Sequence, residues 1–265
     1  MPRRSAHPAH GWGLPASWVT LIVLGLSIYP NKDVDGIEVF CGAGELTAAC
    51  TRHGMNFHGI DKFTCDPVLH DVLSEVGLKH LVFMMCRCKP GALIWIGMPC
   101  SSFVFVGRSN SGRYCWLPSG DEEREYTQLH NKLATVSYYL ALLAFHLGLV
   151  YVIEQPITSC FFELLEVVRI LTLTGATRIT LHMAAYGGSS RKTMCLWGTA
   201  PWLHALQRGL AFAPQAVAQL VTRKRSLTGH TNVIGQRKAL KDSGAYTSSF
   251  GDMVASEQAG CVEPA

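Results

Sequence analysis

The stretch that most constrains the fold of this chain is an apolar run over 93–96 that ends in Gly97, Pro99 and Cys100. A short apolar run bounded by turn formers is typical of a parallel strand that is covered on both faces. In open parallel sheets, ligands bind beyond the carboxyl ends of the strands. Cys100 is therefore predicted to lie at such an end, where a thiol can take part in chemistry.

The same pattern occurs once before and once after this stretch. Residues 37–40 are followed by a loop that contains Gly42 and Gly44, and residues 150–153 are followed by Glu154. Three predicted strand ends thus carry a glycine-rich loop, a thiol and a carboxylate. Because the carboxyl ends of parallel strands share one edge of a sheet, we expect these groups to converge on one cleft.

The composition is typical of a globular protein with a sizeable core. The chain has 265 residues, of which 48% are hydrophobic and 16% charged, and one domain accounts for it most simply. The ten cysteines have no regular spacing and several lie within apolar runs, which favours free thiols in a reducing compartment. A net charge of +4 permits a polyanionic partner without requiring one.

Residues 1–33 are predicted to form an N-terminal tail and an apolar segment. Residues 1–15 are rich in proline and glycine, and residues 16–29 are almost wholly apolar. A basic start followed by an apolar stretch is the outline of a signal peptide or anchor. The stretch is shorter than the roughly 20 residues of a comfortable membrane span. An element packed on the core is favoured, and targeting stays open.

Residues 34–205 alternate strand, loop and helix, as in a nucleotide-binding domain. After the glycine loop we expect a helix over 46–53, ended by Gly54, and then a strand over 56–60 that ends at Asp61. Glycines let a ligand approach the backbone, and an acid after the second strand can accept hydrogen bonds from ribose hydroxyls.

The rest of this domain follows the same alternation. A brief third strand over 68–73 would carry Asp71, and a Ser/Gly/Arg loop over 107–120 is long enough to be functional. Helices are expected over 75–88, 121–147 and 161–173, and a hairpin over 178–197. Residues 206–265 are predicted to form a basic, partly disordered C-terminal tail, with nucleic-acid contact as the sharper alternative.

Cys100 and Glu154 each have a structural and a chemical interpretation. Cys100 lies between a proline and two serines, and incomplete burial in such a turn favours a nucleophile over a structural thiol. Glu154 ends an apolar strand, where a carboxylate is costly to bury without a partner. Either a salt bridge or an acid with a raised pKa would account for it, and the acid is favoured.

A metal site is not expected. Cys86 and Cys88 lie close to His80 in the sequence. A structural zinc site usually needs four ligands, commonly as two spaced pairs, and the second pair is missing.

Together these motifs resemble those of the cytosine-5 DNA methyltransferases, which are S-adenosylmethionine-dependent enzymes with a Rossmann-like sheet. Residues 40–44, Phe-Cys-Gly-Ala-Gly, resemble the Phe-x-Gly-x-Gly cofactor loop of that family. Pro99 and Cys100 resemble its Pro-Cys nucleophile turn, and residues 154–156 resemble its Glu-Asn-Val acid motif. Arg191, in the late hairpin, resembles part of its Gln-x-Arg-x-Arg segment.

The resemblance implies a fold, a cofactor and a set of site residues. The fold would be α/β, a Rossmann-like methyltransferase fold with a mostly parallel sheet and a late antiparallel hairpin. The catalytic residues implied are Cys100, Glu154 and Arg191. The residues implied to bind S-adenosylmethionine are Phe40, Gly42, Gly44, Asp61, Asp71 and Pro99. Those implied to contact nucleic acid are Arg108, Arg113 and Lys192.

The activity implied is methyl transfer to carbon-5 of cytosine in nucleic acid, with DNA favoured over RNA. The expected location is inside the cell, and the nucleus stays open as the compartment. Only residues 199–265 follow the hairpin, which leaves little room for a target-recognition domain. We therefore expect slow, non-specific activity or a partner that supplies recognition. Two alternatives stay open: a cofactor-binding or nucleic-acid-binding module without turnover, and a protein that residues 16–29 anchor or export.

Overall fold

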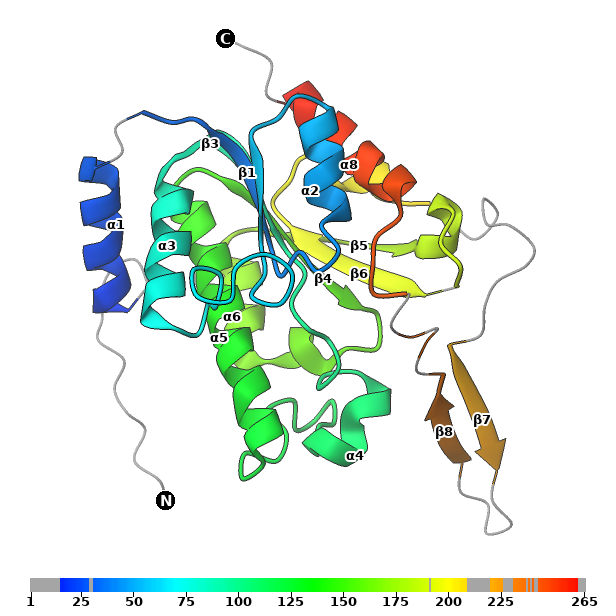
Figure 1. Cartoon of the computed structure of the whole chain (residues 1–265). Helices are drawn as coiled ribbons and strands as arrows, with labels where there is room; N and C mark the ends of the chain where they lie inside the picture. The colour runs from blue at the N-terminus through cyan, green and yellow to red at the C-terminus, as the bar shows by residue number, and fades with distance from the viewer. Residues whose placement is uncertain are drawn as a thin grey trace.

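The computed structural model describes residues 15–28, 31–190, 192–208, 220–225, 231–236, 238, 240 and 243–261. These residues form an α/β body around a six-stranded sheet, and a two-stranded hairpin that projects from it (Figure 1).

The six-stranded sheet has the order β2-β1-β3-β4-β6-β5. Its strands are β1 (Val34–Val39), β2 (Phe57–Ile60), β3 (Cys88–Ile96), β4 (Val150–Pro156), β5 (Thr177–His182) and β6 (Thr193–Gly198). Strands β1 to β4 pair in parallel, whereas β6 inserts antiparallel between β4 and β5. This arrangement confirms the predicted architecture, an α/β Rossmann-like fold with a mostly parallel sheet and a late antiparallel hairpin.

Helices cover both faces of the sheet (Figure 1). One face carries α3 (Glu75–Cys86), α5 (Glu125–His146) and α6 (Leu165–Leu173), and the other carries α2 (Glu45–Arg52) and α8 (Ser248–Cys261). Consecutive residues of β3 alternate between the two hydrophobic clusters, with Ile94 and Ile96 in the first and Leu93 and Trp95 in the second. The apolar run is therefore covered on both faces, as its composition predicts.

The apolar segment near the N-terminus is a helix, α1 (Ala16–Ile28), that packs on α3 (Figure 1). Trp18 and Ile22 are buried in the first hydrophobic cluster. The helices approach closely at Gly25, where a Cβ atom would lie 2.8 Å from the Sγ atom of Cys86. The favoured interpretation of this segment, an element packed on the core, is confirmed. No helix among the described residues is long and apolar enough to cross a membrane.

Two predicted elements differ in the structure. Residues 68–73 form turns rather than a third strand, because Asp66 accepts the backbone N–H groups of Val68 and Leu69, both at 2.8 Å. Such local hydrogen bonds favour turns over a sheet ladder. The helix expected to run to residue 88 ends at Cys86, and Cys88 instead begins β3.

The segment expected to be a C-terminal tail contains a helix of the body. Helix α8 lies beside α2 (Figure 1), with Phe250 and Val254 buried in the second hydrophobic cluster. Arg52 of α2 pairs with Asp252 of α8 at 2.7 Å. Strands β7 (Val221–Arg225) and β8 (Thr231–Gly235) pair antiparallel as the projecting hairpin.

Short helices occupy several of the connections. They are η1 (Phe105–Gly107), α4 (Arg108–Ser111), η2 (Cys160–Glu163), η3 (Met183–Tyr186) and η4 (Leu203–Leu206).

Candidate active site

The carboxyl ends of the first four strands meet at one edge of the sheet. The register pairs Val39 of β1 with Ile96 of β3, and Ile96 with Ile153 of β4. The next residues along these strands, Phe40, Gly97 and Glu154, therefore lie at the same edge, the first two in loops and Glu154 near the end of β4. This is the edge at which open α/β sheets bind their ligands.

The loop after β1 leaves open space beside its backbone. Gly42 and Gly44 have positive φ angles of 53° and 71°, and a Cβ atom on either would meet no atom within 4 Å. Phe40 also has a positive φ, of 63°, and is the non-glycine residue with this conformation among those described. A bulky residue in this region is strained, and such strain clusters at ligand sites.

Asp61 ties the turn after β2 to the glycine loop. Its Oδ2 atom accepts the N–H of Gly42 at 3.2 Å, and its Oδ1 atom accepts the N–H groups of Phe63 at 2.8 Å and Thr64 at 3.2 Å. The carboxylate thus lies against the glycine loop, and its remaining lone pair can accept from a ligand hydroxyl.

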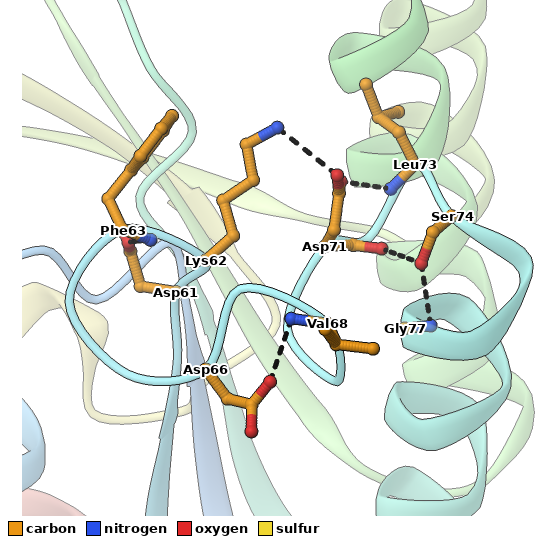
Figure 2. A network of polar contacts seen from close by, with 9 residues as sticks. All are labelled: Asp61, Lys62, Phe63, Asp66, Val68, Asp71, Leu73, Ser74 and Gly77. Carbon is orange, nitrogen blue, oxygen red and sulfur yellow. Dashed lines mark hydrogen bonds and ion pairs between the residues drawn. The ribbon is translucent and has the colours of Figure 1, made fainter.

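Asp71 lies near the turn after β2, but its carboxylate is already paired with other groups of the chain. Figure 2 shows Lys62 reaching from the turn after Asp61 to the carboxylate of Asp71, at 3.3 Å. Its Oδ1 atom also accepts the N–H of Leu73 at 3.1 Å. Asp71 therefore holds the turns before α3 together, and it does not stand at the end of a third strand.

Glu38, which the sequence analysis does not single out, is a buried acid beneath this loop. Its Oε2 atom accepts the N–H of Thr47 at 2.9 Å and the hydroxyl of Thr47 at 2.6 Å, so it supports the first turn of α2. Burial raises the pKa of Glu38 to about 7 against these hydrogen bonds. A glutamate inside the apolar run over 37–40 is the sequence signal that marks it.

Two free thiols lie close together between the glycine loop and the turn after β2. The Sγ atoms of Cys41, in the glycine loop, and Cys65, after β2, lie 3.6 Å apart. Cys41 is buried and Cys65 is exposed, and burial raises the pKa of Cys41.

Cys100 lies in a tight turn after β3 and is partly exposed. Its carbonyl accepts the N–H groups of Phe103 at 2.9 Å and Val104 at 3.1 Å. Burial raises the pKa of the Cys100 thiol, and the positive charge of Lys192 lowers it. The negative charge of Glu154 adds to the rise, so all three ionisable groups act on one another.

Glu154 is buried at the end of β4, and its Oε1 atom has no hydrogen-bond partner. Its Oε2 atom accepts the hydroxyl of Tyr246 at 3.4 Å. Burial raises its pKa against the opposing effects of Lys192 and Tyr246. Within the described part of the chain no cation is close enough for a salt bridge, so the protonated acid is the form this environment favours.

Tyr246, which the sequence analysis also misses, closes the site from the segment before α8. Its hydroxyl accepts the indole N–H of Trp95 at 2.8 Å, and a Cβ atom on Gly97 would lie 3.1 Å from it. In the same segment, the carbonyl of Ser243 accepts from Lys192 at 3.3 Å. Tyr246 lies 92 positions after Glu154, so no local pattern could reveal the contact.

Gln155 fixes the cysteine turn to β4. Its Nε2 atom donates to the carbonyl of Met98 at 2.7 Å, and its Oε1 atom accepts the hydroxyl of Ser159 at 2.9 Å. Because Met98 lies two residues before Cys100, this buried amide ties the turn of the thiol to the strand that carries Glu154.

The prediction that Arg113 contacts nucleic acid is wrong. Arg113 is fully buried and donates to Ser102 at 2.7 Å, to Asn131 at 2.8 Å and to the carbonyl of Pro118. Its guanidinium lies 3.8 Å from the ring centroid of Phe103. A loop rich in Ser, Gly and Arg is usually solvated. In this loop, however, the Arg113 side chain is buried and hydrogen-bonded to the loop itself and to α5.

The other basic residues predicted to act in the site are Arg108, Lys192 and Arg191. Arg108 lies at the start of α4, partly exposed, with its guanidinium 4.7 Å from the ring centroid of Phe105. Lys192 donates to the carbonyl of Ser243, and its charge lowers the pKa of both Cys100 and Glu154. Arg191 lies outside the described residues.

No protein-family model matches the chain, and no curated protein matches it. Among solved structures, it is similar to a protein described as a DNA modification methyltransferase encoded within a prophage of E. coli, at 14% identity and a TM-score of 0.38. The match covers 71% of this chain and 52% of that one, so the chain spans about half of its length. A likeness this loose carries no argument about function. Any such argument rests instead on the side chains at the carboxyl edge of the sheet.

Proposed function

We propose that this chain transfers a methyl group from S-adenosylmethionine to carbon-5 of cytosine in nucleic acid, with DNA as the favoured substrate. One observation carries the proposal. The Cys100 thiol, after β3, and the buried carboxyl group of Glu154 are close enough for the charge of Glu154 to raise the pKa of the thiol. Burial raises the pKa of Glu154 itself, and its Oε1 atom has no hydrogen-bond partner. A buried polar atom without a partner is costly unless a ligand completes it.

The cofactor side of the site suits a nucleoside ligand. Open space beside Gly42 and Gly44 leaves room for backbone contact, and Asp61 is held where it can accept from ribose hydroxyls. Phe40, Pro99 and Asp71 complete the proposed cofactor set. When bound, S-adenosylmethionine supplies an electrophilic methyl group.

On the substrate side, the thiolate of Cys100 adds to carbon-6 of the cytosine, and Glu154 donates its proton in a hydrogen bond to ring nitrogen 3. The negative charge that the addition pushes into the ring is offset there, which makes carbon-5 nucleophilic. After transfer, a water molecule takes up the carbon-5 proton and the thiolate departs, which restores the ring. Lys192 favours the thiolate by its charge, and Arg191 is a further proposed catalytic group.

The test is covalent trapping on an oligonucleotide that contains 5-fluorocytosine, in the presence of S-adenosylmethionine. Because fluorine at carbon-5 cannot leave as a proton, the Cys100 adduct should persist on a denaturing gel. Cys100→Ser should give no adduct and still bind S-adenosylmethionine in calorimetry. Cys261→Ser, which changes an exposed thiol, is the matched control and should trap as the wild type does.

Glu154→Gln should slow methyl transfer by roughly 10²–10⁴-fold, which is the usual contribution of general acid catalysis. Cofactor affinity should stay unchanged, because the side chain keeps its shape and lies on the substrate side. Undiminished transfer by Glu154→Gln, or methylation by Cys100→Ser, would overturn the proposed chemistry.

The burial of Cys100 favours a second candidate, a cofactor-binding or nucleic-acid-binding module without turnover. A raised pKa leaves less thiolate for attack. In that case S-adenosylmethionine would bind, and the 5-fluorocytosine oligonucleotide would be recovered free of protein.

A further inference from the structure

Two aromatic rings form an exposed stacked pair in the loop that follows Cys100. The rings of Tyr114 and Trp116 have centroids 4.8 Å apart and planes within 11° of parallel. Trp116 is 80% exposed and Tyr114 is 38% exposed. A flat aromatic pair with a face open to solvent is the kind of surface on which nucleobases stack.

Backbone hydrogen bonds hold the turn that carries the pair. Tyr114 and Leu117 exchange two backbone hydrogen bonds, at 3.2 and 2.9 Å, which close a tight turn with Trp116 inside it. Arg113, immediately before this turn, is fully buried and anchored by the hydrogen bonds described above. Because the turn is fixed before any ligand arrives, little conformational entropy is lost on binding.

The turn lies against the cysteine turn. Arg113 donates to Ser102, two residues after Cys100. The thiol of Cys115 neighbours that of Cys160, and the N–H of Cys160 donates to the carbonyl of Phe103 at 2.9 Å. The stacked pair is therefore joined by these contacts both to the loop of Cys100 and to the segment that follows Glu154.

Positive charge accompanies the aromatic surface. The Arg108 guanidinium lies 5.5 Å from the ring centroid of Tyr114, and its Nε atom is buried without a hydrogen-bond partner. The hairpin of β7 and β8 contacts η1, next to Arg108, and carries Lys224 and Arg225 exposed on β7. Figure 1 shows the hairpin and α4 toward the same end of the molecule.

We infer that the turn over 114–117, with Arg108, is a stacking platform for unpaired bases, and that the nucleic acid this chain takes is single-stranded. Aromatic rings interleaved with cations are the usual means of binding a single strand. In a duplex the base faces are already stacked on one another, so an aromatic pair gains nothing from them. A single strand also presents its cytosine without the cost of extrusion from a helix.

This inference rests on the proposed function for the identity of the target base, but the platform can be tested without turnover. The protein is the full chain with Cys100→Ser and no S-adenosylmethionine. Fluorescence anisotropy compares three labelled probes of equal length: a mixed-sequence single strand, the same backbone made wholly of abasic sites, and a duplex.

Trp116→Ala should weaken binding of the mixed single strand by roughly tenfold to a hundredfold, as the loss of one stacked base does. Its affinity for the abasic strand should not change, because phosphate contacts remain. Arg108→Gln should weaken both. Phe145→Ala removes another exposed ring, at the far end of α5, and should change neither. Because Trp116 is exposed, the thermal unfolding of its variant should match that of the parent.

Three results would overturn the platform: tighter binding of the duplex than of the single strand, an equal loss on the abasic strand, or no loss in Trp116→Ala. The last would assign the patch to a protein partner. If the trapping experiment gives no adduct but Trp116→Ala still weakens binding of the single strand, the methyl-transfer proposal is overturned and the stacking platform is supported.

Discussion

Two carboxyl groups under the site, Glu38 and Glu154, are buried, and burial raises the pKa of both. They differ in their partners. Glu38 is satisfied by Thr47, whereas Glu154 has one free oxygen atom at the strand edge. A satisfied buried acid supports the fold, and an unsatisfied one is available to a ligand. The distinction therefore lies in hydrogen bonding and not in the pKa shift.

Glu38 should make the stability of the protein depend on pH. Its pKa is about 7 in the folded chain against an ordinary value of 4.5, so between these pH values the folded state holds a proton that the unfolded state has lost. Folding stability should therefore fall as pH rises from about 4.5 through about 7, by up to about 3 kcal/mol.

Urea unfolding at several pH values measures this effect. Glu38→Gln keeps the acceptor for Thr47 and does not titrate, so its stability should vary less across the same range. Glu166→Gln, at an exposed position of α6, is the control and should follow the wild type. A Glu38→Gln variant that loses stability as steeply as the wild type would assign the pH dependence to other groups.

At the scale of elements, the contact between α2 and α8 is close at one point and open at another. A Cβ atom on Gly251 would lie 2.9 Å from the Cβ of Ala49 and 3.2 Å from the carbonyl oxygen of Glu45. A Cβ atom on Gly260, in the same helix, would meet nothing within 4 Å.

Gly251→Ala and Gly260→Ala form a matched pair. Both gain helix propensity, worth up to about 1 kcal/mol. Only Gly251→Ala forces the helices apart, at a cost of roughly 1–3 kcal/mol. Denaturant unfolding should find Gly251→Ala less stable than the wild type and Gly260→Ala equal to it or more stable. The reverse order would mean that α8 does not pack on α2 in solution.

The turns that carry Cys41 and Cys65 should join on oxidation. The two sulfur atoms are already in contact at 3.6 Å, and a disulfide needs about 2.05 Å, so a small movement suffices. Hydrogen peroxide would oxidise the exposed Cys65 thiol to a sulfenic acid with release of water. The Cys41 thiol would then displace a second water to form the disulfide.

Peptide mapping by mass spectrometry after brief peroxide treatment checks this expectation. The linked peptides containing Cys41 and Cys65 should appear, with a loss of two hydrogen atoms, and Cys65→Ser should abolish them. Cys261→Ser alters another exposed thiol and should leave the link intact. Absence of the link in the wild type, with Cys65 oxidised further, would show that the two loops hold the sulfur atoms apart.

At the scale of the whole molecule, the sequence predicts the sheet better than its surroundings. The apolar runs over 93–96 and 150–153 could be recognised because a strand covered on both faces has a local signature. Arg113 and Tyr246 could not be interpreted correctly, because burial of the first and the contact of the second with Glu154 depend on segments distant in the chain. Helix α8 was missed because its apolar residues are few and lie among small and polar ones.

Removal of residues 243–265 should disrupt the whole body and not merely shorten it. Helix α2 and Trp95 would lose Phe250 and Val254, which cover them in the second hydrophobic cluster. We expect the shortened chain to bind a hydrophobic dye and to lose cooperative unfolding. A peptide of residues 243–261, added in trans, should reverse both effects, whereas the same peptide with Phe250→Asp should not. Normal cooperative unfolding of the shortened chain would contradict this role of α8.

The pairing of α2 with α8 joins residues 200 positions apart, as the contact between Arg52 and Asp252 shows. A ribosome releases the chain from its N-terminal end, so α2 emerges long before the helix that covers it. Contacts of such separation also form slowly. Until residues 243–261 have left the ribosome, the apolar face of α2 stays open to chaperones and to other nascent chains. The yield of folded protein in a cell should therefore depend on how fast the last part of the message is translated.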